Sequence, residues 1–354
     1  MPKEGKNKKV VVAMSGGVDS SVAAALLKKQ GYYVVGAFMK FWKEPGRVEN
    51  RCCSSESEIR ARKVAKILKI PFYVFNFEKE FKKRIVDYFL KENKRGLTPN
   101  PCVVCNKEIK FGLLLGKTLK LEADSIATGH YARIKDGRLF SARDKDKDQS
   151  YFLWKLNQKQ LKHVLFPIGD YTRKEVEKMA RKFKLPFAGV KKSQEICFIP
   201  ATVNDFLKQY IKPKPGQIVN NKKKVLGRHQ GLYFYTIGQR KGIGFSGGPY
   251  YVLDKNLKNN ILVVTKNEKD LCKKELIARN VNWLSGKEPK LPLRVAAKIR
   301  YRHEYAPATI IKNLKFKIKN YYGVIFDKPQ RAITPGQSVV FYKGQELLGG
   351  GIIC

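Results

Sequence analysis

The residues with the clearest chemical potential form a short run near the N-terminus, Ser15 to Ser21 (SGGVDSS). An apolar run, Val10 to Met14, precedes it and predicts a buried strand, while Ser20 to Gln30 is rich in Ala and Leu and predicts a helix. Glycines let a backbone approach an anion closely, and the free N–H groups at a helix start attract phosphate. The run lacks the Gly-Lys-Ser/Thr ending of a Walker loop. It therefore predicts a backbone cradle for a pyrophosphate group.

A second set of reactive residues consists of cysteines, which occur at positions 52, 53, 102, 105, 197, 272 and 354. Their odd number in a chain with no secretion signal argues against a structural disulfide framework. A zinc site on the Cys102/Cys105 pair would need two further ligands, and the chain has only four His and no second Cys-x-x-Cys. Reactive and merely buried thiols remain open as alternatives.

The surroundings of Cys105 favour a reactive thiol. Two prolines stiffen the expected loop Thr98 to Asn106, and Asn106 is suited to cap a helix that begins at Lys107. A helix start with lysines at 107 and 110 should lower the pKa of the Cys105 thiol. A further cysteine, Cys197, follows the lysines at 191 and 192.

The elements that must position these residues alternate between strand and helix. Further strands are expected over Tyr33 to Phe41, Phe72 to Phe77 and Ser125 to Thr128, and helices over Glu56 to Leu68, Lys79 to Asn93 and Lys107 to Leu121. This alternation is typical of an α/β fold with a parallel sheet. After about Asn204 short strands punctuated by Gly and Pro dominate, which indicates a small β-rich domain and then a terminal β-barrel.

Composition narrows the functional classes. With 354 residues and 43% hydrophobic content, the chain should form two or three domains with apolar cores. Seventy-two Lys and Arg against 30 Asp and Glu leave a net charge of +42, which favours a nucleic-acid partner, although a lysine-rich genome is an alternative cause. No apolar run of about 18 residues and no signal peptide are visible. We therefore expect no membrane span and a cytoplasmic protein.

The loop Ser15 to Ser21 resembles the pyrophosphate loop of the PP-loop ATP pyrophosphatases, which cleave ATP between its α- and β-phosphates and adenylate a carbonyl oxygen. Further strings, in order along essentially the whole chain, make it similar to the bacterial tRNA-specific 2-thiouridylases, which put sulfur on the wobble uridine of Lys, Glu and Gln tRNAs. These strings are Asn100 to Phe111 (NPCVVCNKEIKF), Ala127 to Tyr131 (ATGHY), Lys147 to Phe152 (KDQSYF), Ile196 to Phe198 (ICF), Gly238 to Gly242 (GQRKG), Thr334 to Ser338 (TPGQS) and Gly349 to Ile353 (GGGII).

The resemblance implies a fold and a domain order. Residues 1–204 would form a PP-loop ATP-binding and catalytic domain, which is Rossmann-like and of the adenine-nucleotide α-hydrolase type. Residues 205–275 would form a small β-rich central domain, and residues 276–354 a tRNA-contacting C-terminal β-barrel. The expected partners are tRNA and a sulfur-relay or cysteine-desulfurase donor that supplies persulfide sulfur, and we expect a monomer.

The resemblance also assigns roles to residues. Cys105 would be the nucleophile and Cys197 the persulfide carrier, with a Cys105–Cys197 disulfide formed in turnover; no resident metal site is assigned. ATP with Mg²⁺ would bind at Ala13, Met14, Ser15, Gly16, Gly17, Val18, Asp19, Ser20, Met39 and Gly129. The target base would lie at Asn100, Pro101 and Cys102, and tRNA at His130, Asp148, Gln149, Ser150, Arg300, Tyr301 and Gln337. Some relatives have Asp in place of Cys102, and a thiol is a weaker general acid–base near neutral pH.

Two alternatives stay open. Cys102, Cys105 and Cys197 are a three-thiolate set of the kind that holds a [4Fe–4S] cluster in other PP-loop tRNA thiolases. The chain could instead be a non-catalytic tRNA-binding protein with a degenerate ATP loop. The intact loop, together with Cys105 and Cys197, argues against the second alternative.

Overall fold

The N-terminal half is built on a parallel sheet. The computed structural model describes residues 8–44, 53–186, 196–244, 246–312 and 320–354. Five strands lie in the order β3-β2-β1-β4-β7, and every neighbouring pair is parallel. They are β1 (Lys9–Ala13), β2 (Tyr33–Lys40), β3 (Phe72–Asn76), β4 (Ser125–Thr128) and β7 (Val164–Leu165). The predicted strands in this half are confirmed, and their apolar runs reflect burial on both faces of the sheet.

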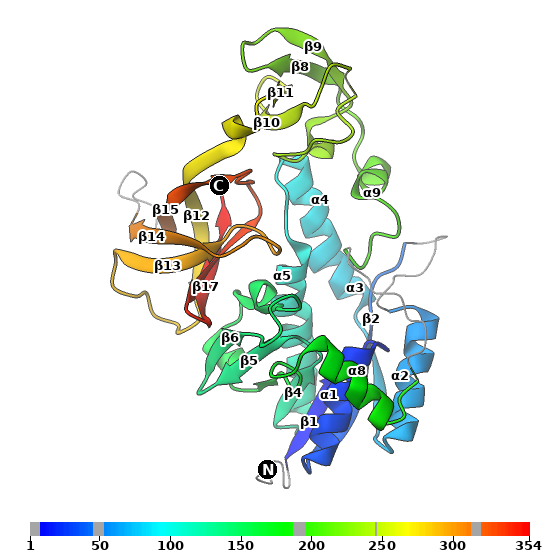
Figure 1. The fold of residues 1–354 in the computed structure, drawn as a ribbon. Coiled ribbons are helices and arrows are strands. Elements are labelled where there is room, and N and C mark those ends of the chain that lie inside the picture. The colour runs from blue at the N-terminus through cyan, green and yellow to red at the C-terminus, as the bar shows by residue number, and fades with distance from the viewer. Residues whose placement is uncertain (1–7, 45–52, 187–195, 245, 313–319) are drawn as a thin grey trace.

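Helices cover both faces of this sheet (Figure 1). Val10 and Val12 of β1 belong to a core shared with α1 (Val18–Lys29), α2 (Ser55–Ile67) and α8 (Arg173–Lys182). Val11 and Ala13 belong to the other core, which is shared with the helices that follow β3. Those helices are α3 (Glu78–Phe81), η1 (Lys82–Val86), α4 (Asp87–Lys94), α5 (Pro101–Cys105), η2 (Asn106–Leu114) and α6 (Leu115–Lys120).

The structure corrects the expected start of the cysteine-bearing helix. We predicted a loop to Asn106 and a helix from Lys107, but the chain is helical from Pro101. Asn100 is the extended N-cap residue and Pro101 occupies the first turn, where a missing N–H costs nothing. Asn106 does not cap; its Nδ2 donates to the Phe152 carbonyl oxygen at 3.1 Å. Cys105 therefore lies one turn inside the helix.

The central unit is small. It contains α9 (Val203–Tyr210), η4 (Leu232–Phe234) and a four-stranded sheet in the order β10-β11-β8-β9. The strands are β8 (Gly216–Asn220), β9 (Val225–His229), β10 (Tyr251–Asn256) and β11 (Ile261–Thr265). Its core includes Ile218, Val252 and Leu262, each at 0% exposure. The expected small β-rich unit is confirmed.

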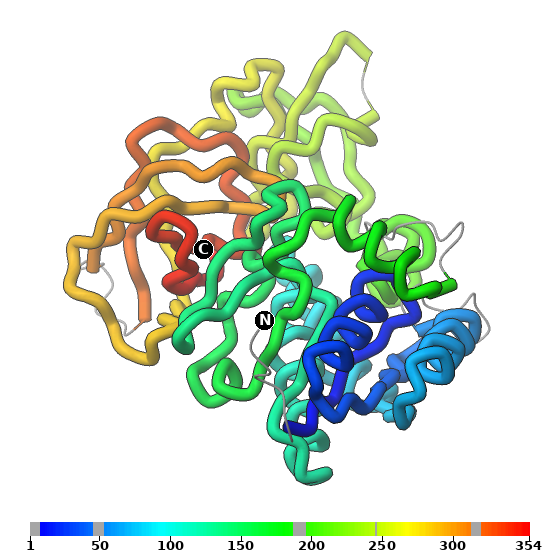
Figure 2. Tube along the Cα trace, turned by 60° about the horizontal axis from the view of Figure 1, so that its bottom comes forward, coloured from blue at the N-terminus to red at the C-terminus, as the bar shows by residue number. Residues whose placement is uncertain are grey.

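The C-terminal unit is a closed barrel, as predicted. Its ring runs β12-β15-β14-β13-β16-β17, and pairing of β12 with β17 closes it. After η5 (Glu268–Leu271), the strands are β12 (Cys272–Trp283), β13 (Leu293–Lys298), β14 (Ala306–Lys312), β15 (Tyr321–Arg331), β16 (Ser338–Lys343) and β17 (Glu346–Ile353). A hairpin from the N-terminal half, β5 (Ala132–Lys135) and β6 (Arg138–Ser141), extends this sheet because β6 pairs with β17. The barrel and the hairpin lie side by side in Figures 1 and 2.

Buried hydrogen bonds fix the barrel to the N-terminal half. They arise around η3 (Ser150–Leu153) and the residue after it, ahead of α7 (Gln158–Leu161). Trp154 Nε1 donates to Ser338 Oγ at 3.0 Å, and Tyr151 Oη donates to the Ser338 carbonyl oxygen at 2.9 Å. Both aromatic side chains are at 0% exposure.

None of the helices in the described ranges combines the length and apolar character that a membrane span requires.

Candidate active site

The loop between β1 and α1 has the geometry of an anion cradle. Gly16 has φ +71°, and a Cβ there would come 2.2 Å from the Ser57 carbonyl oxygen, so only glycine fits. Gly17 is the N-cap of α1, and no side chain caps the helix. The Ser20 and Ser21 hydroxyls donate to the Gly17 carbonyl oxygen at 3.2 and 2.9 Å rather than capping the first-turn N–H groups. The helix start is therefore available for a phosphate.

Gly129, at the end of β4, packs directly against this helix start. A Cβ on Gly129 would lie 2.5 Å from the Ser20 nitrogen. The close approach of β4 to α1 thus requires glycine. Gly129, which the sequence analysis assigned to ATP, is brought beside the loop by this packing.

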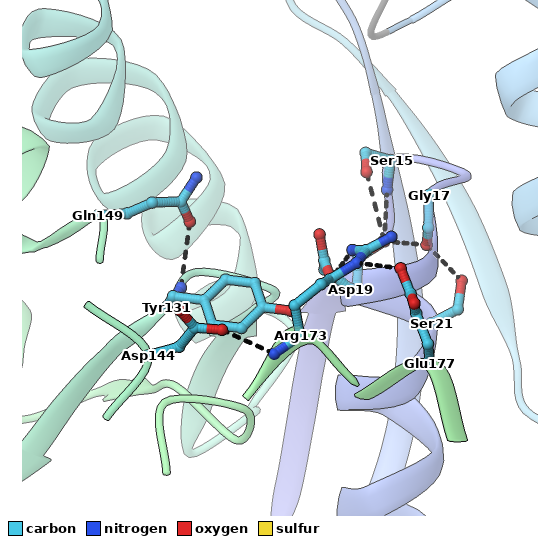
Figure 3. A network of polar contacts seen from close by, with 10 residues as sticks. Ser15, Gly17, Asp19, Ser21, Tyr131, Asp144, Gln149, Arg173 and Glu177 are labelled. Atoms are coloured by element: carbon cyan, nitrogen blue, oxygen red, sulfur yellow. Dashed lines mark hydrogen bonds and ion pairs between the residues drawn. The ribbon is translucent and has the colours of Figure 1, made fainter. Parts of the chain in front are cut away.

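Asp19, in the first turn of α1, is the centre of a polar network (Figure 3). Its Oδ1 accepts hydrogen bonds from Tyr131 Oη at 2.9 Å and from Arg173 Nη1 at 2.5 Å. Gln149 Oε1 accepts from the Tyr131 backbone N–H at 3.1 Å. One network therefore links the loop, the end of the β4 segment and the string Lys147 to Phe152.

A cavity of about 240 Å³ adjoins the carboxyl ends of β1 and β2. Of the residues predicted for function, it is lined by Met14, Ser15, Met39, Pro101, Cys102, Cys105, His130, Gln149 and Cys197. Its walls are mostly apolar and include Phe38, Phe81 and Phe198. The structure thus brings the start of the phosphate loop and the cysteines Cys102, Cys105 and Cys197, called the three motif cysteines below, to one cavity, called the thiol cavity below.

The aromatic core holds the Cys197 segment in place. Phe198 is 2% exposed and its ring packs edge-on against Phe81, Phe89 and Phe206, with centroids 5.6–5.8 Å apart. Anchoring Phe198 in this way sets Cys197 at the cavity wall. The lysines at 191 and 192, which precede Cys197 in the sequence, lie outside the described residues.

The expectation of a lowered pKa for Cys105 is wrong. Cys105 is 8% exposed, and burial raises the pKa of its thiol; Lys110 opposes that shift without overcoming it. Burial also raises the pKa of Cys102 to about 11, and the neighbouring Cys197 adds to that increase. The helix start is a full turn away from Cys105, so its dipole does not offset the loss of hydration.

His130 presents a neutral ring to the same cavity. Burial, with a smaller contribution from Lys110, lowers its pKa well below the ordinary value. The Thr128 hydroxyl lies 2.6 Å from His130 Nδ1. His130 is therefore uncharged near neutral pH and can contribute hydrogen bonds but no charge.

A larger cavity of about 800 Å³ opens beside the first, and the two share Cys102, Gln149 and Phe152 in their walls. The Tyr301 ring lies 4.5 Å from the Phe152 ring, centroid to centroid. Cationic side chains in its wall are Lys145, Lys147, Arg173, Lys298 and Arg302, and acidic ones are Asp19, Asp146, Asp148 and Glu304. This is a groove with charge and aromatic surface that meets the thiol cavity.

Three residues predicted to face tRNA are engaged inside the protein. Ser150 is fully buried, and its hydroxyl donates to Asp148 Oδ2 at 2.9 Å. Asp148 also accepts from the Ala142 N–H at 3.0 Å. Gln337 Nε2 donates to the Thr98 carbonyl oxygen at 2.9 Å. Arg300 is in neither cavity wall, and burial together with the nearby Arg331 lowers its pKa.

Sequence reasoning assigned no role to three residues that the structure brings to the site: Tyr131, Phe152 and Arg173. Tyr131 and Phe152 lie within the strings that carry the family resemblance, but no function was given to them. Arg173 lies in no such string, and nothing in the local sequence indicated that it belongs to the site. Lys110, which was expected to act on Cys105, also lines the smaller cavity. No group of three or more His, Cys, Asp or Glu side chains among the described residues is arranged to hold a metal ion.

The fold and the loop define a HUP-type nucleotide-binding domain joined to two β units. Residues 8–201 match the family model "tRNA methyl transferase HUP domain", residues 204–266 a "tRNA methyl transferase PRC-barrel domain", and residues 273–353 an "Aminomethyltransferase beta-barrel domain". These domain names refer to methyl transfer, whereas the full-length relatives carry a different name.

Those relatives match almost end to end. The tRNA-specific 2-thiouridylase MnmA of Clostridioides difficile (strain 630) is 48% identical over 360 residues, covering 98% of both chains. The protein of the same name from Buchnera aphidicola subsp. Acyrthosiphon pisum (strain APS) is 46% identical over 98% of this chain and 97% of its own. The chain belongs to the tRNA-specific 2-thiouridylase MnmA family.

Solved structures give weaker matches. A 4-thiouridine synthetase–RNA complex with bound ATP is 16% identical, with a TM-score of 0.33 over 50% of this chain and 40% of that one. A predicted subunit of tRNA methyltransferase from Methanocaldococcus jannaschii DSM is 19% identical, with a TM-score of 0.33 over 49% of this chain and 74% of that one. Likeness at this level does not bear on function.

Proposed function

We propose that this chain is a cytoplasmic tRNA-uridine 2-sulfurtransferase that thiolates the wobble uridine of Lys, Glu and Gln tRNAs at the expense of ATP. One observation carries the proposal: the start of the phosphate loop and the three motif cysteines line the same cavity. An activating nucleotide and a sulfur carrier would then meet at one base. We assign catalysis to residues 1–204 and tRNA contact to the barrel, residues 276–354, with the unit 205–275 between them.

ATP fits the residues that surround the loop. The uncapped start of α1 offers backbone N–H groups, and Gly16 and Gly129 leave space that any Cβ would fill. Bound ATP, with Mg²⁺, would supply the adenylyl group that turns the uracil C2 oxygen into part of a leaving group. Met14, Ser15 and Met39 connect this loop to the thiol cavity.

The sulfur chemistry needs two thiols with different roles. A persulfide on Cys197, loaded by a donor protein, would attack C2 with its terminal sulfur, and AMP would leave with the original C2 oxygen. The Cys105 thiolate would then attack Cys197 Sγ. The electrons of the broken S–S bond would go to the sulfur on C2, which becomes the thiocarbonyl, and a Cys105–Cys197 disulfide would remain. An external thiol must reduce that disulfide before the next turnover.

The groove beside the thiol cavity suits a single-stranded part of tRNA. Its cations would contact phosphates, and the Phe152–Tyr301 pair would offer aromatic surface to an extruded base. Because Ser150, Asp148 and Gln337 are engaged internally, we propose that Ser150 and Gln337 act by shaping this surface, while Asp148 lies in the groove wall itself.

An iron–sulfur mechanism is the second, less favoured candidate. Cys102, Cys105 and Cys197 line one cavity, but no three His, Cys, Asp or Glu side chains among the described residues are arranged to hold a metal ion. Protein purified without oxygen distinguishes the two routes. Colourless, iron-free and active protein supports persulfide transfer, while brown protein with broad visible absorbance and iron-dependent activity supports a [4Fe–4S] cluster on Cys102, Cys105 and Cys197.

The decisive experiment is mass spectrometry of tRNA nucleosides after incubation with the protein, ATP, magnesium and a persulfide donor. We expect 2-thiouridine derivatives at the wobble position and AMP formation that depends on tRNA. If neither product forms on an intact tRNA substrate, the proposed function is overturned and a non-catalytic tRNA-binding protein is supported.

A further inference from the structure

The phosphate loop lacks a charge that its expected ligand needs. Ser15 to Ser21 contains no Lys or Arg, and it contains one carboxylate, Asp19. A helix start carries only about half a positive charge, whereas pyrophosphate carries several negative ones. The Asp19 carboxylate lies in the first turn of α1 and repels such an anion. Mg²⁺ bound with the ligand would offset part of this charge, and a cationic side chain from elsewhere in the fold would neutralise Asp19 and offset more of it.

Two arginines outside the loop contact it. Arg60 Nε donates to the Gly16 carbonyl oxygen, but its Nη2 is bound to Ser57 and its Nη1 to Glu56, so all three nitrogens are engaged. It lies in the wall of neither cavity described above. Arg60 therefore braces the loop backbone from outside both cavities.

Arg173, by contrast, lines a cavity. Its Nη1 donates to Asp19 Oδ1 and its Nε donates to Glu177 Oε1 at 2.6 Å, so two of its five N–H groups are used in these bonds. Its side chain is 18% exposed and lies in the wall of the larger cavity together with Asp19. The guanidinium thus neutralises Asp19 and keeps N–H groups for a second anion.

The fold holds Arg173 in position through its backbone as well as its side chain, and Figure 3 shows Arg173 beside Asp19, Asp144 and Glu177. Thr172 and Glu175 form a capping box that fixes the start of α8 at this residue. The Arg173 backbone N–H donates to Asp144 Oδ2 at 2.8 Å. Asp144 itself begins the segment that leads to Gln149, at the junction of the two cavities. Such fixation is what a preorganised anion-binding arginine requires.

We propose that Arg173 is a pyrophosphate-binding residue, which contacts the β- and γ-phosphates of ATP through its guanidinium while it neutralises Asp19. The inference rests on the proposed use of ATP and adds to it the cation that the loop lacks. It places the positive charge at the end of the nucleotide that departs as pyrophosphate, not at the AMP portion.

Binding measurements without tRNA test this inference. We would titrate the wild-type chain, Arg173→Gln and Arg173→Lys with inorganic pyrophosphate, with ATP and with AMP by calorimetry, each in magnesium-containing buffer. For Arg173→Gln we expect affinity for pyrophosphate and ATP to fall roughly 10- to 100-fold, the size expected for one hydrogen-bonded charge, with AMP affinity within about twofold. Arg173→Lys should recover part of the loss.

Arg143→Ala is the matched control. Arg143 also pairs with α8, through Glu175 at 3.3 Å, but its side chain is 57% exposed and does not contact Asp19. It should leave all three affinities unchanged. Equal losses for pyrophosphate and AMP in Arg173→Gln, or no loss at all, would overturn the inference and make Arg173 a structural brace.

An Asp19→Asn background separates direct contact from neutralisation. If Arg173 contacts phosphate, adding Arg173→Gln to Asp19→Asn still weakens pyrophosphate binding about tenfold or more. If the effect disappears there, Arg173 acts only on Asp19 and the inference is overturned. A wild-type chain that binds neither ATP nor pyrophosphate would instead overturn the proposed ATP-dependent function, and this inference with it.

Discussion

At the scale of single residues, Lys110 is the positive charge set against the burial of the thiols. It lowers the pKa of both Cys102 and Cys105, although burial still leaves both pKa values raised. Lys110→Met should therefore raise both pKa values further and move alkylation of Cys105 by iodoacetamide to more alkaline pH. Lys110→Arg should restore the profile. The measurement is the alkylation rate between about pH 7 and pH 10, followed by peptide mass spectrometry; an unchanged profile in Lys110→Met would show that this charge does not act on the thiols.

The three cysteines are expected to differ in how far each is required. In the persulfide route, Cys105→Ser and Cys197→Ser each abolish thiolation, because one resolves and the other carries the sulfur. Cys102→Ser should be impaired and Cys102→Asp should retain substantial activity, because Cys102 neither carries nor resolves the sulfur in this route. Iron content measured beside thiolation checks the alternative: joint loss of iron and activity in Cys102→Ser would favour the cluster. Full activity in Cys197→Ser would exclude both.

At the scale of elements, the turn into α1 depends on Gly16. In Gly16→Ala the new Cβ meets the Ser57 backbone at 2.2 Å, so the loop or α2 must move and the phosphate cradle is lost. We expect ATP binding and adenylation to be abolished while tRNA binding stays nearly intact. Gly116→Ala is the control, because a Cβ at Gly116 in α6 has no neighbour within 4 Å and should stabilise that helix by about 1 kcal/mol. Normal ATP consumption in Gly16→Ala would contradict the loop assignment.

The barrel touches the start of the cysteine-bearing helix through one loop. Gln337 bonds the Thr98 carbonyl oxygen, and the Thr98 N–H donates to the Pro335 carbonyl oxygen at 2.9 Å. Gln337→Ala should lower the thiolation rate while leaving pyrophosphate affinity unchanged, because it loosens the residues around Asn100 only. Gln330→Ala removes an amide that bonds locally to Lys328 on β15 and should have no effect. An equal fall in the thiolation rate of both variants would show that the Gln337 contact contributes only to the stability of the barrel.

The elements were predictable from local patterns to differing degrees. The strands of the parallel sheet carry uninterrupted apolar runs, and the loop before α1 has a distinctive string, so both could be predicted. The start of α5 could not be predicted, because Pro101 suits a loop as well as a first helical turn. The sequence also does not show that Asn106 bonds to the Phe152 carbonyl oxygen instead of capping a helix. The pKa direction at Cys105 was missed because local sequence does not report burial. Arg173 was missed because its partner, Asp19, is 154 positions away in the chain.

At the scale of the whole molecule, the charge of +42 makes tRNA binding testable by salt. If phosphates neutralise this surface, the logarithm of the tRNA affinity should fall linearly with the logarithm of salt concentration, at ~0.7–0.9 per phosphate neutralised. Replacing Lys145 and Lys147 together by Gln should lower that slope by about 1 for each phosphate that these lysines neutralise. Filter binding or fluorescence anisotropy at several salt concentrations gives the slope. A salt-insensitive affinity would make the excess charge a compositional property only.

The burial of Cys105 has a consequence for the enzyme at rest in air. Peroxide and other oxidants attack thiolates far faster than thiols, so a site that holds its sulfur protonated and covered is spared between encounters with substrate. Cys272, the first residue of β12, and Cys354 are exposed and should be oxidised before Cys105. The protein should therefore lose accessible thiols under mild peroxide well before it loses the capacity to turn over. The burial that disfavours the Cys105 thiolate thus also protects this thiol in the reduced enzyme during storage.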